Sequence, residues 1–446
     1  MAGQPFEKME EILDGFLKPA AMLLKEVPPE DGTGEIMLKT VEMMNSNLEE
    51  LIDMARNRQK KFVWYEFCLT PELFLSFDLY PSLGEAYPMT YSRVRQDVLA
   101  EFVNAAEDSG IPPEVCSIDK VLIGAILSGE MPTPDLIVTT SAPCDSSRTG
   151  YQIMEKLIDA PVYKLDAPFS DDAEAMKYYG EQIRDLIPVL ENLSGNKFDI
   201  DRLREIIEES NRATEYINEW NTLRRLKPCP TPARMLLNVL GAVINSFGLP
   251  RCTEFAKAVY ETARERAESG AAKGEKVRVV WQHVPVLFDD TILDWMTDEL
   301  GAVVVDDTLS SYLRQAPIDT TSLDTMLIGL ARRGLNMTMG RLRLPATVYV
   351  NDFLKAYKDY SGDCAILSAH HGCKHCWGAV NLLRGAARRD DIPLLVFDFD
   401  FLDSRIVSSE TVKNKIEQFF KTMELQFCAA SRLIQGGSFV RIQLTP

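Results

Sequence analysis

Residues 364–376 read CAILSAHHGCKHC, an apolar run that leads directly into a group of histidines and cysteines. Three of the chain's four histidines and two of its nine cysteines lie within this stretch after Ala369. In open α/β sheets, ligands bind just beyond the carboxyl ends of the strands, where the chain passes from strand to helix. We therefore predict a strand here followed by a ligand-binding loop. The crowding of soft and borderline ligands suggests that the ligand is a metal.

The same passage from an apolar strand to a helix recurs along the chain, which indicates an α/β fold. Strands that alternate with helices imply parallel sheets, and the strands fall into two sets separated by a long helical stretch. The sets are similar in layout, but no sequence repeat is visible. The predicted strands are residues 61–68, 134–140 and 162–165, and then 276–281, 302–305, 365–368 and 394–397.

Helical periodicity covers the first 60 residues and recurs, with many charges, from Asp172 to about Glu219. We therefore predict two doubly wound parallel-sheet domains, with a helical N-terminal segment and a long helical insertion. The predicted divisions are a helical segment at 1–60, a first α/β domain with the insertion at 61–250, and a second α/β domain at 251–446.

Composition limits the class of protein. The 446 residues predict roughly two or three domains, and 46% hydrophobic with 26% charged residues is typical of a soluble globular protein. A net charge of -18 argues against nucleic acid as the main partner. Neither a signal peptide nor a membrane span is visible in the sequence, so we expect a cytoplasmic protein without a membrane partner. Its cysteines are then thiols, core residues or ligands rather than disulfides.

Four cysteines lie at or beside predicted junctions that lead into helices: Cys68, Cys116, Cys144 and Cys373. A folded cleft can bring them together, but their wide spacing differs from the compact cysteine runs of ferredoxins. The alternative is that they are small buried hydrophobic residues. Cys373 and Cys376 are two residues apart, but a structural zinc site needs a second such pair, which the chain lacks. A thioredoxin-like redox pair is the other alternative, but such a pair lies in the first strand-to-helix turn of a small domain and not near residue 373.

Several polar residues beside these cysteines are candidates for chemistry. Ser146 and Arg148 follow Cys144. They either cap a helix, or they bind a ligand: Arg148 and the backbone amides would hold an anion, or a hydroxyl would donate a hydrogen bond to a cluster sulfur. Glu66 and Glu85 flank the Cys68 junction, and each is an acid/base candidate or a solvated surface group. The histidines at 370, 371 and 375 are ligands, acid/base groups or satisfied polar residues. No glycine-rich motif for a dinucleotide or nucleoside triphosphate is present.

The order of these motifs resembles the 2-hydroxyacyl-CoA dehydratase superfamily, which includes the ATP-dependent benzoyl-CoA reductases and the double-cubane cluster proteins. The resemblance runs over most of the chain. It is carried by FCLTPEL at 67–73, Cys116-Ser117 followed by Gly124, PDLI at 134–137 leading to Pro143-Cys144-Asp145, HGCK at 371–374, and IPLLVFDFD at 392–400.

The resemblance implies two flavodoxin-like domains that hold a four-iron four-sulfur (4Fe-4S) cluster. Three cysteines bind the cluster in the family, and by order they match Cys116, Cys144 and Cys373, which leaves one iron open. Ser146 and Arg148 would contact the cofactor. The family places the Cys68 region beside the substrate, and Glu66, Glu85 and His371 are then the candidates for catalytic acid or base.

The implied activity is that of a lyase that eliminates water from a 2-hydroxyacyl-CoA thioester. The β-hydrogen of this substrate is not acidic until one electron converts the thioester to a ketyl radical. In the family, a separate ATP-hydrolysing iron–sulfur activator supplies that electron, and a homologous second subunit completes a heterodimer of anaerobic metabolism. Two alternatives stay open, an ATP-dependent benzoyl-CoA reductase subunit and a double-cubane cluster protein that transfers electrons or reduces small molecules.

Overall fold

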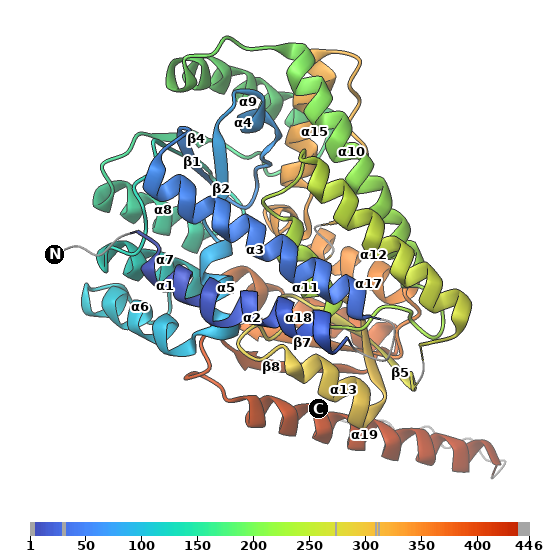
Figure 1. Ribbon diagram of the computed structural model, residues 1–446. Coiled ribbons are helices and arrows are strands. Elements are labelled where there is room, and N and C mark those ends of the chain that lie inside the picture. The colour runs from blue at the N-terminus through green and yellow to red at the C-terminus, as the bar shows by residue number, and fades with distance from the viewer. Residues whose placement is uncertain (1–4, 29–32, 273, 308–309, 311–312, 436–446) are drawn as a thin grey trace.

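The chain folds into two parallel sheets whose strands alternate with helices, as the sequence predicts (Figure 1). The computed structural model describes residues 5–28, 33–272, 274–307, 310 and 313–435. Each sheet has four strands, and every strand pair is parallel. The α/β prediction is therefore confirmed.

The first sheet has the strand order β2-β1-β3-β4. Its strands are β1 (Phe62–Tyr65), β2 (Tyr80–Leu83), β3 (Leu136–Thr140) and β4 (Val162–Leu165). The chain moves from β1 outward to β2 and then returns to the other side of β1 for β3, so the topological switch point lies between β1 and β3. Ligands bind at such a point in open α/β sheets. β2 was not among the predicted strands.

The second sheet repeats this arrangement with the order β6-β5-β7-β8. Its switch point therefore lies between the second sheet's two central strands, β5 and β7. This shared order is that of the first four strands of flavodoxin-like folds. Each of the four predicted strands overlaps an observed one: β5 (Val277–Gln282), β6 (Ala302–Asp307), β7 (Cys364–His370) and β8 (Leu394–Phe399).

Helices connect the strands in both halves. In the first half they are α4 (Glu72–Ser76), α5 (Ala86–Val94), α6 (Gln96–Asp108), α7 (Ser117–Leu127) and α8 (Asp145–Leu157). In the second half they are α13 (Thr291–Leu300), α15 (Leu323–Leu335), α16 (Thr338–Arg341), α17 (Ala346–Asp359), α18 (Lys374–Arg389) and α19 (Ser409–Gln435). Figure 1 shows α19 along the lower edge of the molecule.

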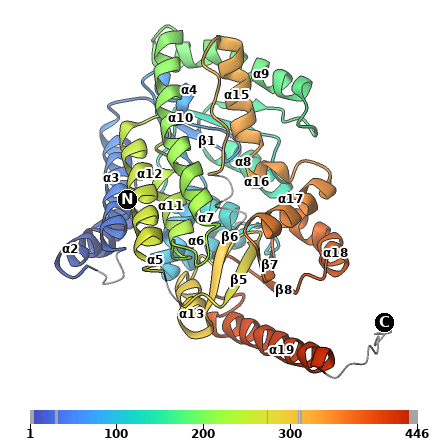
Figure 2. The ribbon, with the colours of Figure 1, turned by 90° about the vertical axis from the view of Figure 1, so that its right-hand side faces the viewer.

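Helices outside the two sheets join the halves. The N-terminal segment forms α1 (Glu7–Ile12), a π-helix η1 (Leu13–Leu17), α2 (Lys18–Glu26) and α3 (Gly34–Asn57). The helical insertion forms α9 (Ala173–Ser194) and α10 (Ile200–Leu223), and α11 (Met235–Val243) and α12 (Pro250–Ser269) follow it. α10 lies beside α12, and α9 packs against α15 of the second half (Figure 2). The predicted division at residue 250 stays a prediction, and α12 directly after it packs on α3 and α10.

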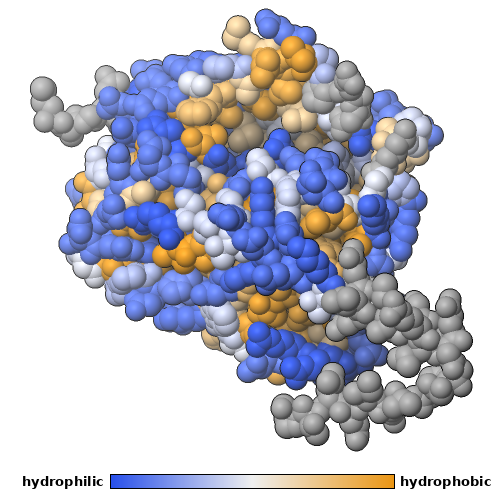
Figure 3. All heavy atoms as spheres, turned by 90° about the horizontal axis from the view of Figure 1, so that it is seen from below, coloured by the Kyte–Doolittle hydropathy of each residue, from blue (hydrophilic) through white to orange (hydrophobic). Residues whose placement is uncertain are grey.

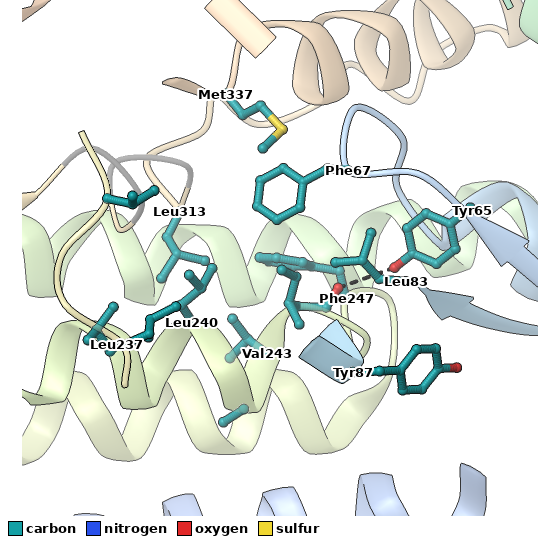
Figure 4. Close-up of a cluster of buried hydrophobic side chains, with 14 of the residues drawn as sticks. Tyr65, Phe67, Leu83, Tyr87, Leu237, Leu240, Val243, Phe247, Leu313 and Met337 are labelled. Atoms are coloured by element: carbon teal, nitrogen blue, oxygen red, sulfur yellow. Dashed lines mark hydrogen bonds between the residues drawn. The ribbon is translucent and has the colours of Figure 1, made fainter. Parts of the chain in front are cut away.

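The central strands of each sheet are buried, because apolar and aromatic side chains fill both of their faces. Trp64 in β1 and Trp281 in β5 are completely buried. One continuous core extends through both halves. Figure 4 shows a part of it in which side chains from widely separated segments meet, namely Tyr65, Phe67, Leu83, Tyr87, Leu237, Leu240, Val243, Phe247, Leu313 and Met337.

The surface seen from below is mostly hydrophilic, with separate hydrophobic patches (Figure 3). Among the described residues, no helix combines the length and the apolar character that crossing a membrane requires.

Candidate functional site

A cavity of about 370 Å³ lies where the switch points of the two sheets face each other. Phe67 follows β1 and Cys144 follows β3, while His283 follows β5 and Cys373 follows β7. The lining includes Phe67, Glu85, Met89, Val115, Cys116, Ile118, Asp119, Pro143, Cys144, Ser146, Ser147, His283, Val284, Met339, Leu342, His370, Gly372, Cys373, Lys374, His375 and Phe401. The fold thus converges on one cavity from both halves.

Three of the four cysteines singled out from the sequence line this cavity, and each one occupies the N-cap of a helix. Cys116 precedes α7, Cys144 precedes α8 and Cys373 precedes α18. The Ser147 N–H donates to Sγ of Cys144 over 3.4 Å, and the Cys376 N–H donates to Sγ of Cys373 over the same distance. Backbone donors and the helix dipole both favour negative charge on sulfur here.

Burial has the opposite effect on these thiols. It raises the pKa of Cys116 and of Cys144 well above the usual range, and it also raises the pKa of Cys373. The thiols therefore keep their protons at neutral pH when no cation is nearby. A bound metal removes this penalty, because it replaces the protons and binds the thiolates. Soft sulfur donors of this kind suit zinc, copper(I) or iron–sulfur groups.

The spacing of the donors distinguishes between these groups. Within the described ranges, no three side chains of histidine, cysteine, aspartate or glutamate come together closely enough to hold a single metal ion. A zinc ion needs all its sulfur ligands about 2.3 Å from one point. Three thiols that surround a cavity without converging on a point fit a larger group, such as an iron–sulfur cluster.

Gly372 sets the contact between two of these cysteines across the two halves. A Cβ atom on Gly372 would lie 2.6 Å from Cα and 2.8 Å from the backbone nitrogen of Cys116. Such distances are too short for real atoms, so only glycine allows the turn after β7 to approach the start of α7. The glycine next to Cys373 therefore allows Cys116 to approach it.

His370, the last residue of β7, contacts Cys116 directly. Its Nε2 lies 3.2 Å from Sγ of Cys116. On the other side of the ring, Nδ1 lies 3.8 Å from Oδ2 of Asp400, which follows β8. Both side chains are almost completely buried. Burial lowers the pKa of His370, which favours the neutral ring.

Ser146 links the starts of α7 and α8. Its Oγ accepts the Cys116 N–H over 3.2 Å and donates to Oδ2 of Asp119 over 2.5 Å. Burial raises the pKa of Asp119 to about 6. Arg148, the other predicted cofactor contact, is exposed on α8, and its guanidinium lies 3.4 Å from Asp145. Ser146 thus lies at the cavity and Arg148 does not line it.

The two predicted carboxylates differ in position. Glu66 is completely buried behind the cavity, where it accepts from Thr139 Oγ1 over 2.5 Å, the Thr140 N–H over 2.6 Å and Ser147 Oγ over 2.6 Å. Burial raises the pKa of Glu66 to about 7 in spite of these donors.

Glu85 lines the cavity at the start of α5. Oε1 of Glu85 accepts from the Tyr151 hydroxyl over 3.2 Å, while its buried Oε2 has no hydrogen-bond partner among the residues that the structure describes. Burial raises the pKa of Glu85 well above its usual range. The side chain is therefore a neutral carboxylic acid beside the cavity.

His371 does not line the cavity. Its side chain is exposed, and its backbone N–H donates to the carbonyl of Phe399 over 2.7 Å. Cys68 is completely buried and does not line the cavity. Cys376 does not line it either, but its backbone N–H donates to Sγ of Cys373. The sequence reasoning did not single out His283, Asp119 or Asp400. Of these, His283 and Asp400 had a visible signal, because each follows a predicted strand as Cys373 does.

The sequence matches the family described as 2-hydroxyglutaryl-CoA dehydratase, D-component, over residues 68–423. The chain belongs to this family. The matched region of this dehydratase family member contains both sheets beyond β1, and it contains Cys116, Cys144 and Cys373. The predicted resemblance to the superfamily is therefore confirmed.

Curated relatives of this dehydratase family member include a reductase and several dehydratases. A benzoyl-CoA reductase subunit of Thauera aromatica is 24% identical over 436 residues, which cover 89% of this chain and 96% of the relative. The (R)-2-hydroxyisocaproyl-CoA dehydratase alpha subunit of Clostridioides difficile is 22% identical over 343 residues, 73% of this chain and 81% of the relative. Lactoyl-CoA dehydratase subunit alpha of Anaerotignum propionicum is 26% identical over 204 residues, 44% of this chain and 46% of the relative.

Proposed function

We propose that the chain is the iron–sulfur subunit of a 2-hydroxyacyl-CoA dehydratase, a lyase that removes water from a 2-hydroxyacyl-CoA thioester. One observation carries the proposal: Cys116, Cys144 and Cys373 cap three helices around a single cavity at the switch points of both sheets. The family and the names of its dehydratase relatives support it.

The three cysteines would hold a 4Fe-4S cluster, for which their soft donors and separated positions are suited. When bound, such a cluster supplies a one-electron carrier and an iron that can act as a Lewis acid. The amides at the helix N-termini then stabilise the thiolates, and the Ser146 hydroxyl keeps two of the helices in register.

The proposed reaction starts when one electron is added to the thioester, which gives a ketyl radical. Hydroxide then leaves C2, a proton leaves C3, and the electron is given up again, so the net change is loss of water. Glu85 is placed to hold or release a proton, because its side chain lines the cavity and its Oε2 makes no hydrogen bond among the described residues. Apolar side chains exclude water from the radical, namely Phe67, Met89, Val284, Met339, Leu342 and Phe401.

The lining also favours an acyl group that carries no second charge. Among the described residues that line the cavity, Lys374 is the one lysine or arginine, and its side chain is exposed. Asp119, a buried carboxyl group whose pKa burial raises to about 6, also lines the cavity. A dicarboxylic acyl group would therefore bring a second negative charge into a lining whose described residues offer no buried lysine or arginine to pair with it.

Two protein partners belong to the proposal. The relatives are named as subunits of their enzymes, which supports a homologous second subunit for this chain. The electron would come from a separate ATP-hydrolysing iron–sulfur activator, which the resemblance implies.

A second candidate function is that of an ATP-dependent benzoyl-CoA reductase subunit. It is favoured by the alignment with the benzoyl-CoA reductase relative, which spans 96% of that protein. Both functions need the same cluster and a thioester in the same cavity. They differ in whether the added electrons stay in the product.

The experiment that tests the proposal is an anaerobic assay of the purified protein with its second subunit and an activator. It offers a 2-hydroxyacyl-CoA and benzoyl-CoA in parallel reactions. Formation of the enoyl-CoA without net consumption of reductant supports the dehydratase, whereas ring reduction with stoichiometric consumption of reductant supports the reductase. A protein that holds a cluster but converts neither thioester contradicts both.

A further inference from the structure

We propose that His370 is a positioning residue, which donates a hydrogen bond from Nε2 to Sγ of Cys116 and thereby raises the reduction potential of the cluster. The inference rests on the proposed function, because it assigns Cys116 as a cluster ligand. It adds a role for a histidine of the second half in tuning a ligand of the first half.

The geometry holds the ring in one place. Nε2 lies 3.2 Å from Sγ of Cys116, within hydrogen-bond distance for sulfur. The ring packs edge to face on Phe401 with 4.8 Å between centroids, and on Phe399 with 6.5 Å. The side chain is only 3% exposed. A buried ring that packs against two aromatic side chains cannot turn away from the sulfur without disturbing the core.

Asp400 closes the opposite side of the ring, and it is itself fixed. Its Oδ1 accepts from Ser117 Oγ over 2.7 Å and from the backbone N–H groups of Leu402 and Asp403, each over 2.9 Å. Ser117 is the residue after Cys116, so Asp400 ties the start of α7 to the end of β8. The Nδ1 atom of His370 has no hydrogen-bond partner among the described residues, and Oδ2 of Asp400 at 3.8 Å is too far for one, so the contact with Cys116 is the shorter of these two polar contacts of the ring.

The chemistry of the ligand decides the direction of this hydrogen bond. A cysteine bound to iron is a thiolate, which has no hydrogen and can only accept. The contact is then a hydrogen bond only if Nε2 carries a hydrogen that points at the sulfur. A donor to a ligand sulfur stabilises the more negative, reduced cluster, and hydrogen bonds to sulfur are among the factors that set cluster potentials.

The test compares two substitutions of similar size in the reconstituted protein. His370→Gln keeps an N–H donor that can reach the position of Nε2, whereas His370→Leu fills the site without a donor. The measurements are iron per chain and the midpoint potential from a redox titration followed by electron paramagnetic resonance. We expect wild-type iron in both variants, a lower potential in His370→Leu, and a potential near that of the wild type in His370→Gln.

Equal potentials in all three proteins would overturn the inference, and so would an equal shift in both variants. If His370→Leu fails to hold iron, its potential cannot be compared, and a measurement on the wild-type protein tests the hydrogen bond instead. Pulsed resonance on wild-type protein labelled with ¹⁵N-histidine should detect one histidine nitrogen with an exchangeable proton coupled to the cluster, and its absence rejects the hydrogen bond. A wild-type protein that binds no iron would instead reject the proposed function on which the inference rests.

Discussion

At the scale of single residues, the three cavity cysteines experience two opposing effects. Burial raises the pKa values of their thiols, while the helix N-termini favour the thiolate. A thiol in this position is inert by itself and becomes a strong ligand once a cation arrives. The Sγ atoms of Cys144 and Cys373 each accept a hydrogen bond from a backbone N–H. This hydrogen bond becomes stronger when the sulfur is a metal-bound thiolate.

Replacing Cys144 with serine should abolish retention of iron, because an alkoxide is a poor ligand for iron–sulfur groups. Cys229→Ser is the matched control: Cys229 is also buried, but it lies outside the cavity and donates to the Thr231 carbonyl, as a serine hydroxyl can. Iron analysis after anaerobic reconstitution measures both. Equal iron in the two variants would remove Cys144 from the ligand set.

Replacing Glu85 with glutamine should slow turnover by about 10²- to 10⁴-fold while iron stays bound, because the amide keeps the shape of the acid but cannot exchange its proton in the same way. Glu101→Gln, at an exposed position of α6, serves as the control. Single-turnover assays with saturating substrate measure the effect. A rate within about twofold of the wild type would show that Glu85 is not the acid/base group.

Glu66 makes the stability of the protein depend on pH. Its folded pKa of about 7 lies above the usual 4.5, so its proton is held more tightly in the folded state. The resulting stabilisation is complete below about pH 4.5, and it is lost as the pH rises through 7. Glu66→Gln mimics the protonated form, so its free energy of unfolding should fall less than that of the wild type between pH 5 and pH 8. Urea unfolding at both values measures this, and an unchanged difference would contradict the assigned pKa.

At the scale of elements, the turn between β7 and α18 depends on a glycine. A Cβ on Gly372 would meet the Cys116 backbone at 2.6 Å and 2.8 Å, and backbone cannot move aside as a flexible side chain can. We expect Gly372→Ala to cost about 1–3 kcal/mol of stability and to reduce bound iron. Gly378→Ala in α18 meets nothing within 4 Å, so it should leave iron unchanged and stabilise the helix by up to about 1 kcal/mol. Thermal unfolding and iron analysis compare the two, and an alanine tolerated at 372 would refute the close contact.

The elements also show which features the sequence could reveal. Seven strands were predicted because buried parallel strands are continuous apolar runs. β2 was missed because Pro81 and Ser82 interrupt its apolar character. The order β2-β1-β3-β4 places it at the edge of the sheet, where proline is tolerated because no neighbour needs its N–H on the outer side.

The site was predictable to a similar degree. Cysteines at the starts of helices stand out in sequence, and Cys116, Cys144 and Cys373 indeed line one cavity. Which of the adjacent histidines lines the cavity was not visible in the sequence: His370 ends β7 and lines the cavity, whereas His371 begins the turn after the strand and is exposed. Asp400 reaches His370 through the packing of β8 beside β7, which no local sequence pattern reveals.

At the scale of the whole molecule, two halves with the same strand order direct their switch points at one cavity. Each half supplies different groups. The first provides Cys116, Cys144 and Glu85, and the second provides Cys373 and His370. Neither half alone contains the complete cysteine set, so the site exists only when the halves are packed together. The helices α9 and α15, which pack across the two halves, belong to the structure that holds it.

The shared cavity also predicts selectivity for uncharged acyl groups. Isocaproyl-CoA should bind at least about tenfold more tightly than glutaryl-CoA, because a second carboxylate that meets no buried lysine or arginine among the described residues of the lining costs more than about 1.4 kcal/mol. Equilibrium binding by calorimetry under anaerobic conditions measures the ratio. Equal or tighter binding of glutaryl-CoA would contradict the assignment of the lining.

The content of iron and acid-labile sulfide in the anaerobically purified and reconstituted protein tests the central claim most directly. A 4Fe-4S cluster bound through Cys116, Cys144 and Cys373 should give about four of each per chain, with a broad brown absorption. A colourless protein that contains no iron after reconstitution would contradict it, and these cysteines would then be buried thiols at the starts of three helices.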